Sequence, residues 1–238
     1  MAASKKVIAF DLYGTLLSTR SINRTLAKIY NERNAKQLAA SWRRYQLEYT
    51  WRINSMGQYK SFSQITRNAL SHAVAEYRLT LSENDADTLM KSYDALPVFL
   101  DIPAALRLLE NNKDSVEAYV FSNGTDEMVG NSIKTSPDLG PHAERFKSII
   151  TADSLKCFKP DRRTYEHLVE QAGKQGKESD VWVVSANPFD IVGSRAAGLK
   201  AAYIDRSGKG WIDRLDEERA PEVIALSVDK AINSILED

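Results

Sequence analysis

Four short apolar runs, each followed by a polar or glycine-containing turn, constrain the fold more than any other feature of this chain. They span 7–10, 116–121, 181–184 and 201–204, and residues 148–151 form a weaker fifth run. Each is rich in β-branched or aromatic residues, which is typical of strands buried on both faces of a sheet. The runs therefore predict the strands of a buried parallel sheet.

Helical patterns lie between these runs. One helix is expected to open at Pro103, a second to begin near Arg162, and a third to run from Pro188 to Gly198. An early proline and a terminal glycine are typical helix boundaries. Because strands that alternate with helices form parallel sheets, the sequence predicts an α/β fold with a Rossmann-like core.

The segment 18–96 breaks this alternation, since it holds no convincing strand. Its apolar residues recur at helical spacing, among them Leu38, Trp42, Tyr45, Tyr49, Ala69, Leu70, Ala73, Val74 and Tyr77. Ser82, followed three residues later by Asp85, resembles a capping box. We expect an all-helical cap domain at 18–96, inserted into a core domain formed by 1–17 and 97–238.

Charge and cysteine usage limit the possible partners. The 238 residues carry 32 Lys or Arg and 32 Asp or Glu, a formal net charge of zero. Nucleic-acid binding needs clustered excess cations, so we expect no such partner, although a local basic pocket for a small anion is compatible with this balance. The run 7–10 is too short for a signal peptide or membrane span, and the single Cys157 cannot form an internal disulfide. A cytoplasmic protein with no membrane partner is expected.

Polar residues directly follow the predicted strands. They are the segment Asp11 to Thr15, the segment Ser122 to Gly124, the segment Ser185 to Asn187, and Lys159 beyond the weaker run. Ligands of open parallel sheets bind at the carboxyl ends of the strands. We therefore expect this set of Asp, Thr, Ser, Asn and Lys to form one site.

These residues also carry a family resemblance. Taken alone, Asp11 could equally be a turn or cap residue or a catalytic residue. The hexapeptide Asp11-Leu12-Tyr13-Gly14-Thr15-Leu16, however, resembles the first motif of the haloacid dehalogenase superfamily. Ser122, Lys159 and the stretch from Ser185 to Asp190 resemble its second, third and fourth motifs.

The motifs differ from those of the superfamily's phosphatases. At the first motif, the phosphatases of the superfamily have the pattern Asp-x-Asp, in which the second aspartate protonates the leaving group. This chain has Tyr13 at that position, and a tyrosine with its ordinary pKa near 10 is poorly suited to this task at neutral pH. The fourth motif begins with Ser185 and leaves Asp11 and Asp190 as the only obvious carboxylates. Magnesium sites rely on carboxylates and phosphate oxygens, so neither a metal nor another cofactor is expected.

The same differences resemble the L-2-haloacid dehalogenase subfamily. The stretch Trp42 to Trp51 is similar to that subfamily's cap helix, in which an arginine, here Arg43, follows the first tryptophan. Without this likeness, Arg43 would be read as a solvated surface cation. Phe62 matches an aromatic residue that lines the halide site, although ordinary packing also explains it.

The resemblance implies a covalent mechanism. Asp11 would attack the 2-carbon of an (S)-2-haloalkanoic acid and expel halide, and water would hydrolyse the aspartyl ester to the (R)-2-hydroxy acid. The other implied catalytic residues are Thr15, Arg43, Ser122, Lys159, Tyr165, Ser185, Asn187 and Asp190. Leu12, Tyr13, Arg43, Phe62, Ser122, Asn123 and Phe189 would contact the substrate or halide. The likeness also suggests a homodimer.

Two other functions stay open at this point. A magnesium-dependent small-molecule phosphatase would need metal, and a catalytically idle binding protein would turn over nothing. The sequence also leaves open whether Lys159, Asn187 or Asp190 activates the hydrolytic water.

Overall fold

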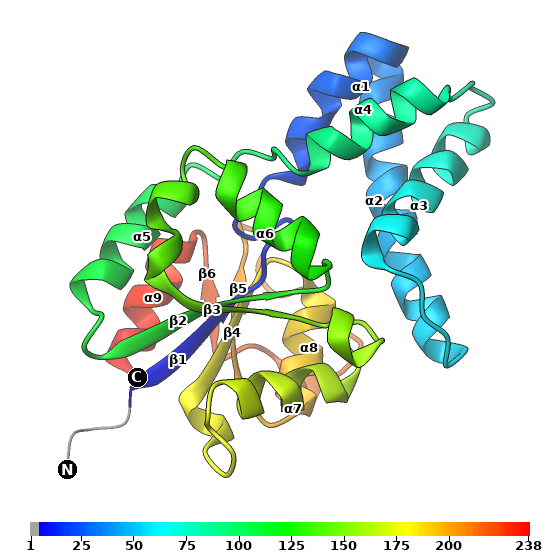
Figure 1. The fold of residues 1–238 in the computed structure, drawn as a ribbon. Coiled ribbons are helices and arrows are strands. Elements are labelled where there is room, and N and C mark those ends of the chain that lie inside the picture. Colours follow the sequence, from blue (N-terminus) through cyan, green and yellow to red (C-terminus); the bar gives the residue numbers. More distant parts are fainter. Residues whose placement is uncertain (1–4) are drawn as a thin grey trace.

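The core of the molecule is a six-stranded sheet in which every neighbouring pair is parallel (Figure 1). The computed structural model describes residues 5–238. In spatial order the strands are β3 (Phe146–Thr151), β2 (Val116–Ser122), β1 (Lys6–Phe10), β4 (Val181–Ser185), β5 (Lys200–Ile204) and β6 (Val223–Ala225). The five predicted strands are confirmed, and β6 is an additional edge strand.

Alternate side chains of β1 pack against helices on opposite faces of the sheet. Ile8 and Phe10 pack into the cluster that contains α5 (Ile102–Asn111), α6 (Asp126–Thr135) and α9 (Val228–Glu237). Val7 and Ala9 pack into the cluster on α7 (Arg162–Gln171), beside which lies α8 (Pro188–Ala196). Successive strand residues point to opposite faces, so a continuous apolar run is the expected sequence of a strand between two helix layers.

The helices between the strands begin and end close to the predicted residues. Pro103 lies in the first turn of α5, and α8 starts at Pro188. Gly198, with φ of +89°, leaves the chain in the left-handed region just after α8. The helix α6 lies outside the predicted elements. Its N-cap is Thr125, whose side chain accepts a hydrogen bond from the Met128 N–H at 3.2 Å.

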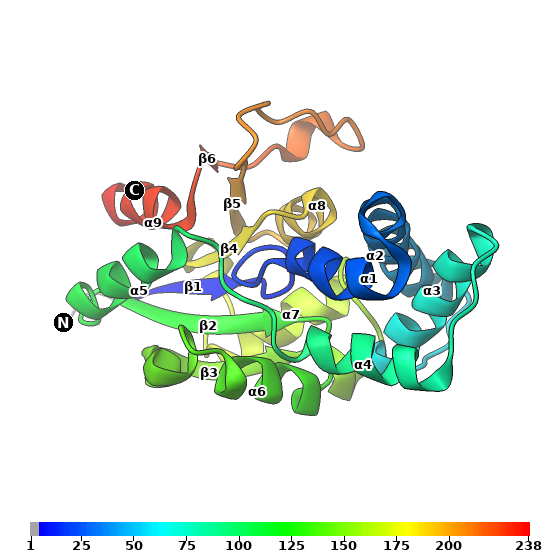
Figure 2. The same cartoon turned by 90° about the horizontal axis from the view of Figure 1, so that it is seen from above.

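Residues 23–93 form four helices, and these lie beyond the carboxyl ends of the strands (Figures 1 and 2). They are α1 (Asn23–Tyr30), α2 (Glu32–Ser55), α3 (Phe62–Glu76) and α4 (Glu83–Tyr93). Ser82 caps α4 as predicted, accepting from the Asp85 N–H at 3.1 Å, while its hydroxyl donates to the Asp85 carboxylate at 2.6 Å. Trp42 links α2 to α3 through a hydrogen bond, since its indole N–H donates to the Thr66 carbonyl at 2.7 Å.

The two chain segments that join these helices to the sheet run side by side. The Ser18 N–H donates to the Pro97 carbonyl at 2.8 Å, and the Phe99 N–H donates to the Leu16 carbonyl at 3.1 Å. The predicted domain boundaries, between 17 and 18 and between 96 and 97, fall within this pair of segments. Across residues 5–238, no helix combines the length and apolar character needed to cross a membrane.

Candidate active site

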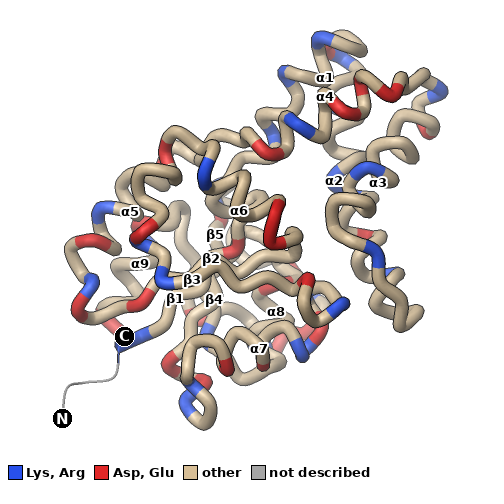
Figure 3. The backbone as a smooth tube through the Cα atoms, in the orientation of Figure 1, with Lys and Arg blue, Asp and Glu red and all other residues tan. Residues whose placement is uncertain are grey.

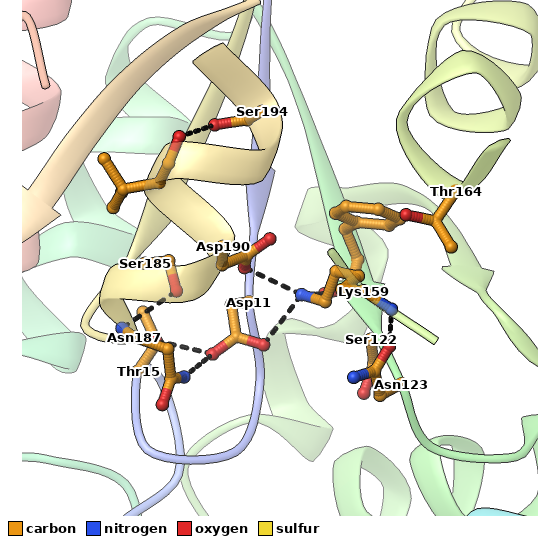
Figure 4. Close-up of polar contacts among 12 residues, drawn as sticks. Asp11, Thr15, Ser122, Asn123, Lys159, Thr164, Ser185, Asn187, Asp190 and Ser194 are labelled. Carbon is orange, nitrogen blue, oxygen red and sulfur yellow. Dashed lines mark hydrogen bonds and ion pairs between the residues drawn. The ribbon is translucent and has the colours of Figure 1, made fainter. Parts of the chain in front are cut away.

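Asp11 is the first residue after β1, and its carboxylate is held at both oxygens (Figure 4). Oδ2 accepts from the Thr15 hydroxyl at 2.7 Å and from Asn187 Nδ2 at 2.7 Å, while Oδ1 accepts from Lys159 Nζ at 3.0 Å. The side chain is buried. Three side-chain donors thus fix the position of this carboxylate and of both its oxygens.

The turn after Asp11 brings these donors into place. Gly14 has φ of +93°, a conformation that residues with a Cβ rarely adopt. The Leu16 and Leu17 N–H groups both donate back to the Leu12 carbonyl, at 3.0 and 2.9 Å. Besides donating to Asp11, the Thr15 hydroxyl accepts from the Ala186 N–H at 2.9 Å, so the turn is fixed to the end of β4.

Lys159 is a fully buried ammonium with three acceptors. Nζ donates to Asp11 Oδ1 at 3.0 Å, to Asp190 Oδ2 at 2.8 Å and to the Phe121 carbonyl at 3.0 Å. An ammonium has three donors, so all are satisfied. The backbone N–H of Lys159 donates to Asn123 Oδ1 at 2.8 Å. These contacts compensate the large cost of removing the charge from water.

Opposing effects act on the proton affinities of this cluster. Burial alone would lower the pKa of Lys159, but the Asp11 and Asp190 carboxylates outweigh it and raise that pKa above its usual value. Burial raises the pKa of Asp190, against the opposing effects of Lys159 and Tyr165. Burial, together with nearby Asp190, also raises the pKa of Tyr165 well above its ordinary value. Lys159 is therefore charged and Tyr165 is a neutral phenol at physiological pH.

Tyr165 supports Lys159 through Asp190. Its hydroxyl donates to Asp190 Oδ1 at 2.9 Å, and Asp190 Oδ2 in turn accepts from Lys159. Gly193 on α8 permits this contact, because a Cβ at that position would lie 2.5 Å from the Tyr165 hydroxyl oxygen. The sequence motifs did not single out Gly193, since its role depends on how closely α8 approaches α7.

The loop after β4 presents Asn187. The Ser185 hydroxyl accepts from the Asn187 N–H at 3.1 Å, which fixes the start of the turn into α8. Asn187 Nδ2 then reaches Asp11 and, at 3.4 Å, the Tyr13 carbonyl. Phe189 is half-buried, and its ring packs edge-on against Trp51 of α2, with ring centres 5.6 Å apart.

Helix α2 extends Arg43 into the same group of residues. Its Nη2 donates to the Tyr13 carbonyl at 3.0 Å and to Asn187 Oδ1 at 3.3 Å. The neighbouring Arg44 is exposed and pairs with Glu76 at 3.3 Å. Arg43, rather than Arg44, thus faces the sheet.

Gln46 lies one turn after Arg43 and is fully buried, although the sequence motifs did not identify it. Its Oε1 accepts from Arg43 Nη1 at 2.6 Å and from the Tyr93 hydroxyl at 3.1 Å. Its Nε2 donates to the Thr66 hydroxyl at 2.7 Å. The i, i+3 spacing from Arg43 was the available signal, because residues so spaced share a helix face.

Aromatic rings form the wall between the helices and the sheet. The Tyr13 ring stacks on Phe62 at 6.0 Å and lies against Tyr93 at 5.7 Å, and Phe62 also packs on Phe158 at 6.1 Å. Burial raises the pKa of Tyr13 far above its usual value, although its hydroxyl bonds Ser132 at 3.1 Å. Tyr13 is therefore a neutral phenol, and its hydroxyl is bonded to Ser132 rather than to the Asp11 carboxylate. Leu12 is fully buried behind this wall.

Ser122 and Asn123 close the site at the end of β2 (Figure 4). The Ser122 hydroxyl oxygen accepts from the Gly124 N–H at 3.1 Å, which leaves its proton as a donor for a ligand. Asn123 gives its carbonyl oxygen to the Lys159 N–H, so Nδ2 is the end that points away from that bond. Both residues thus offer donors beside Asp11.

The donor set does not fit a magnesium ion. All four oxygens of the Asp11 and Asp190 carboxylates already accept from side-chain donors, and the Tyr13 carbonyl accepts from Arg43. In the described part of the chain, His, Cys, Asp and Glu form no group of three suited to a metal. Magnesium requires near-octahedral oxygen coordination, for which these occupied oxygens are unsuited.

The fold and this cluster define the class of the protein. The chain belongs to the haloacid dehalogenase-like hydrolases, whose family profile matches residues 5–198. Strands β1 to β4, the helical insertion and the Asp11–Lys159–Asp190 group lie within that match, whereas β5 and β6 follow it.

Individual relatives are dehalogenases. The chain is 34% identical to haloacetate dehalogenase H-2 of Moraxella sp. (strain B) over 203 residues, covering 85% of this chain and 87% of that protein. It is also 34% identical to (S)-2-haloacid dehalogenase 4A of Burkholderia cepacia over 210 residues, covering 87% and 86%. A solved dehalogenase described as an intermediate complex superposes with a TM-score of 0.86 at 29% identity, covering 98% of both chains.

Proposed function

We propose that this chain hydrolyses the carbon–halogen bond of small (S)-2-haloalkanoic acids and yields (R)-2-hydroxyalkanoic acids. The observation that carries the proposal is the buried Asp11 carboxylate, held between Thr15, Asn187 and Lys159 and approached from α2 by Arg43. Relatives that are named haloacetate and (S)-2-haloacid dehalogenases support it.

In the proposed first step, an Asp11 carboxylate oxygen forms a bond to C2 of the substrate while the carbon–halogen bond breaks. The halide leaves with the bonding electron pair, and the product is an aspartyl ester. Attack on the side opposite the halide inverts C2. Arg43 and Asn123 Nδ2 donate to the leaving halide, since donors are most useful where negative charge develops.

The remaining residues bind substrate or prepare the second step. Ser122 and the backbone N–H groups of the turn after Asp11 receive the substrate carboxylate. Leu12, Tyr13, Phe62 and Phe189 provide its apolar surroundings. Asn187 and Asp190 position the water that attacks the ester carbonyl; the ester C–O bond then breaks, the hydroxy acid takes a proton, and the Asp11 carboxylate is restored.

A magnesium-dependent phosphatase is not favoured, because the carboxylate oxygens near Asp11 are already occupied and Tyr13 replaces the acid of the first motif. An idle binding protein is disfavoured by the complete donor set around Asp11.

We further propose that the chain acts in the cytoplasm as a homodimer. Leu215, Ile224 and Leu226, exposed beyond β5, offer apolar surface for pairing, and sedimentation measures the assembly state.

The decisive assay is halide release from (S)- and (R)-2-chloropropionate, with and without a chelator. We expect turnover of the (S) acid alone, undiminished by chelation. If EDTA abolishes the activity and magnesium restores it, the magnesium-dependent, phosphatase-like function would be the better explanation.

A single turnover in heavy-oxygen water then tests the nucleophile. With enzyme in excess, the new hydroxyl oxygen of the product comes from Asp11, so the product is unlabelled and the peptide containing Asp11 becomes labelled. Direct attack by water on C2 gives the opposite distribution. Mass spectrometry of product and peptide separates the two, and a labelled first-turnover product would refute the assignment of Asp11.

A further inference from the structure

A cavity of about 510 Å³ lies on the helical side of the site, between η1 (Thr19–Ile22), α1 and α2. Its lining includes three cationic side chains, Arg20, Lys36 and Arg43, and no carboxylate. A concave surface lined by charge of one sign concentrates the electric field within it. The cavity is therefore suited to an anion.

The surrounding sequence strengthens this charge. Residues 20–44 carry seven Lys or Arg and a single acid, Glu32, although the whole chain is neutral. Figure 3 shows the cationic positions along α1 and α2. Because the chain as a whole is neutral, this excess of positive charge raises the electrostatic potential only around residues 20–44.

The three cations of the cavity are also unpaired. In the described residues 5–238, none of Arg20, Lys36 and Arg43 has a carboxylate within ion-pair distance. Other arginines of α2 do have partners, since Arg44 pairs with Glu76 and Arg52 with Glu48. Without a carboxylate partner, the positive charge of these side chains is not neutralised within the cavity.

Arg43 joins this cavity to Asp11. Its guanidinium lines the cavity and also donates to the Tyr13 carbonyl at 3.0 Å and to Asn187 Oδ1 at 3.3 Å. Asn187 contacts Asp11 directly at 2.7 Å. An anion that reaches Arg43 through the cavity is thus one side chain away from the nucleophile.

A second cavity, of about 400 Å³, shares Arg20 but has a different charge balance. Its lining contains the Asp205 carboxylate, and its Arg206 is neutralised by an ion pair with Asp101 at 2.9 Å. The first cavity has the larger excess of positive charge.

We infer that the cavity formed by Arg20, Lys36 and Arg43 is the entrance through which a small monocarboxylate anion reaches the site. The identity of that anion as a 2-haloalkanoate rests on the proposed function. Arg20 and Lys36 attract the carboxylate and raise its local concentration, so they act on substrate capture. Arg43, at the inner end, belongs with the residues around Asp11 that carry out the chemical step.

Two matched charge reversals test this entrance. Lys36→Glu places a carboxylate in the cavity, whereas Lys28→Glu makes the same change of net charge at an exposed residue of α1 that is not part of the lining. For Lys36→Glu we expect kcat/KM on (S)-2-chloropropionate to fall at least about threefold at low salt, with kcat changed by less than about twofold. At about 1 M salt, where the Debye length is about 3 Å, the deficit disappears. Lys28→Glu keeps kcat/KM near that of the wild type.

Binding of propionate, measured as the rise in Tm that it produces, gives a readout independent of catalysis. We expect Lys36→Glu to weaken this binding and Lys28→Glu to preserve it. If the wild type releases no halide but binds propionate in this Lys36-dependent way, the proposed function fails and the entrance stands. Equal behaviour of the two variants in both measurements, or a wild type that neither binds propionate nor turns over haloacid, overturns the entrance.

Discussion

At the scale of single residues, Gln46 determines where the charge of Arg43 is placed. Its Oε1 accepts from Arg43 Nη1 at 2.6 Å, while Thr66 and Tyr93 fix the amide itself. A long arginine side chain has many rotamers, and holding one of them costs conformational entropy. The Gln46 network holds the guanidinium beside the Tyr13 carbonyl before substrate arrives.

This arrangement predicts how kcat responds to substitution. Arg43→Ala removes a donor to the departing halide, so kcat should fall at least about tenfold, equivalent to about 1.4 kcal/mol. Gln46→Leu should lower kcat by a smaller factor, because Arg43 remains but is no longer held. Steady-state kinetics on (S)-2-chloropropionate measures both, and Arg44→Ala is the matched control, since Arg44 is exposed on the same helix.

A double variant shows whether Gln46 acts through Arg43. If it does, Gln46→Leu should cost no further activity once Arg43 is alanine, because the two residues form one interacting unit. Losses that multiply would assign Gln46 to packing of α2 against α3 instead. Loss of activity in Arg44→Ala with Arg43→Ala unaffected would mean that the other arginine serves the site.

Tyr165 offers a residue-scale test of pH dependence. Burial raises the pKa of Asp190, and the Tyr165 hydroxyl opposes this by donating to the carboxylate at 2.9 Å. Tyr165→Phe removes that donor, so the Asp190 pKa rises further and the acid limb of the kcat profile should move to higher pH. The deficit should shrink as pH increases, because Asp190 is then ionised in both proteins. A fall of equal size at every pH would indicate that Tyr165 contributes only packing.

At the scale of elements, Asp101 joins four parts of the core. Its carboxylate accepts from Arg206 at 3.0 and 2.9 Å and from the Val228 N–H at the start of α9 at 2.8 Å. Arg206 also donates to the Thr15 carbonyl at 2.9 Å. The start of α5, the start of α9, the loop after β5 and the turn after Asp11 are thereby connected.

The stability of this junction should depend on pH. Burial would raise the pKa of Asp101, but Arg206 and the Val228 N–H outweigh it and lower that pKa below the usual value near 3.9. The ionised form therefore stabilises the fold above about pH 4, and the contribution is lost as the pH falls through the folded-state pKa. Asp101→Asn should cost about 2 kcal/mol at pH 7, a decrease in Tm of about 4–8 °C. At pH 3 the difference from wild type should be smaller.

Thermal unfolding at the two pH values measures this effect, with the exposed Asp138→Asn as control. A destabilisation by Asp101→Asn that is the same at pH 3 and pH 7 would show that packing, rather than the charge, is what Asp101 contributes.

The elements also show what could be predicted from sequence. The five buried strands were predictable because sheet burial on both faces produces uninterrupted apolar runs. β6 was not, since only one of its three residues is buried and an edge strand leaves little pattern. The residues at the strand ends were predictable from motif and topology together. Gln46 and Gly193 were not, because one acts through side-chain hydrogen bonds and the other through the distance between two helices.

At the scale of the whole molecule, the helical insertion holds the loop that carries Lys159. Asn54, near the end of α2, donates from Nδ2 to the Phe158 carbonyl at 2.6 Å and accepts from the Phe158 N–H at 3.0 Å. Phe158 immediately precedes Lys159 and is buried against Phe62 and Tyr59. One amide side chain thus bonds both backbone polar groups of a buried residue across the junction between helices and sheet.

Replacing Asn54 with leucine should loosen this junction. The Phe158 N–H loses its partner and the Phe158 carbonyl keeps only the Asp161 N–H, at a cost of about 1–3 kcal/mol, while a side chain of similar size is kept. We expect amide exchange in the peptide containing Phe158 to accelerate about tenfold or more, and kcat to fall because Lys159 is less firmly placed. Hydrogen–deuterium exchange measured by mass spectrometry reports on the loop, and Ser55→Ala, a change at the exposed neighbour, is the control. Faster exchange with unchanged kcat would mean that the core alone positions Lys159, and unchanged exchange would mean that the helices do not hold this loop.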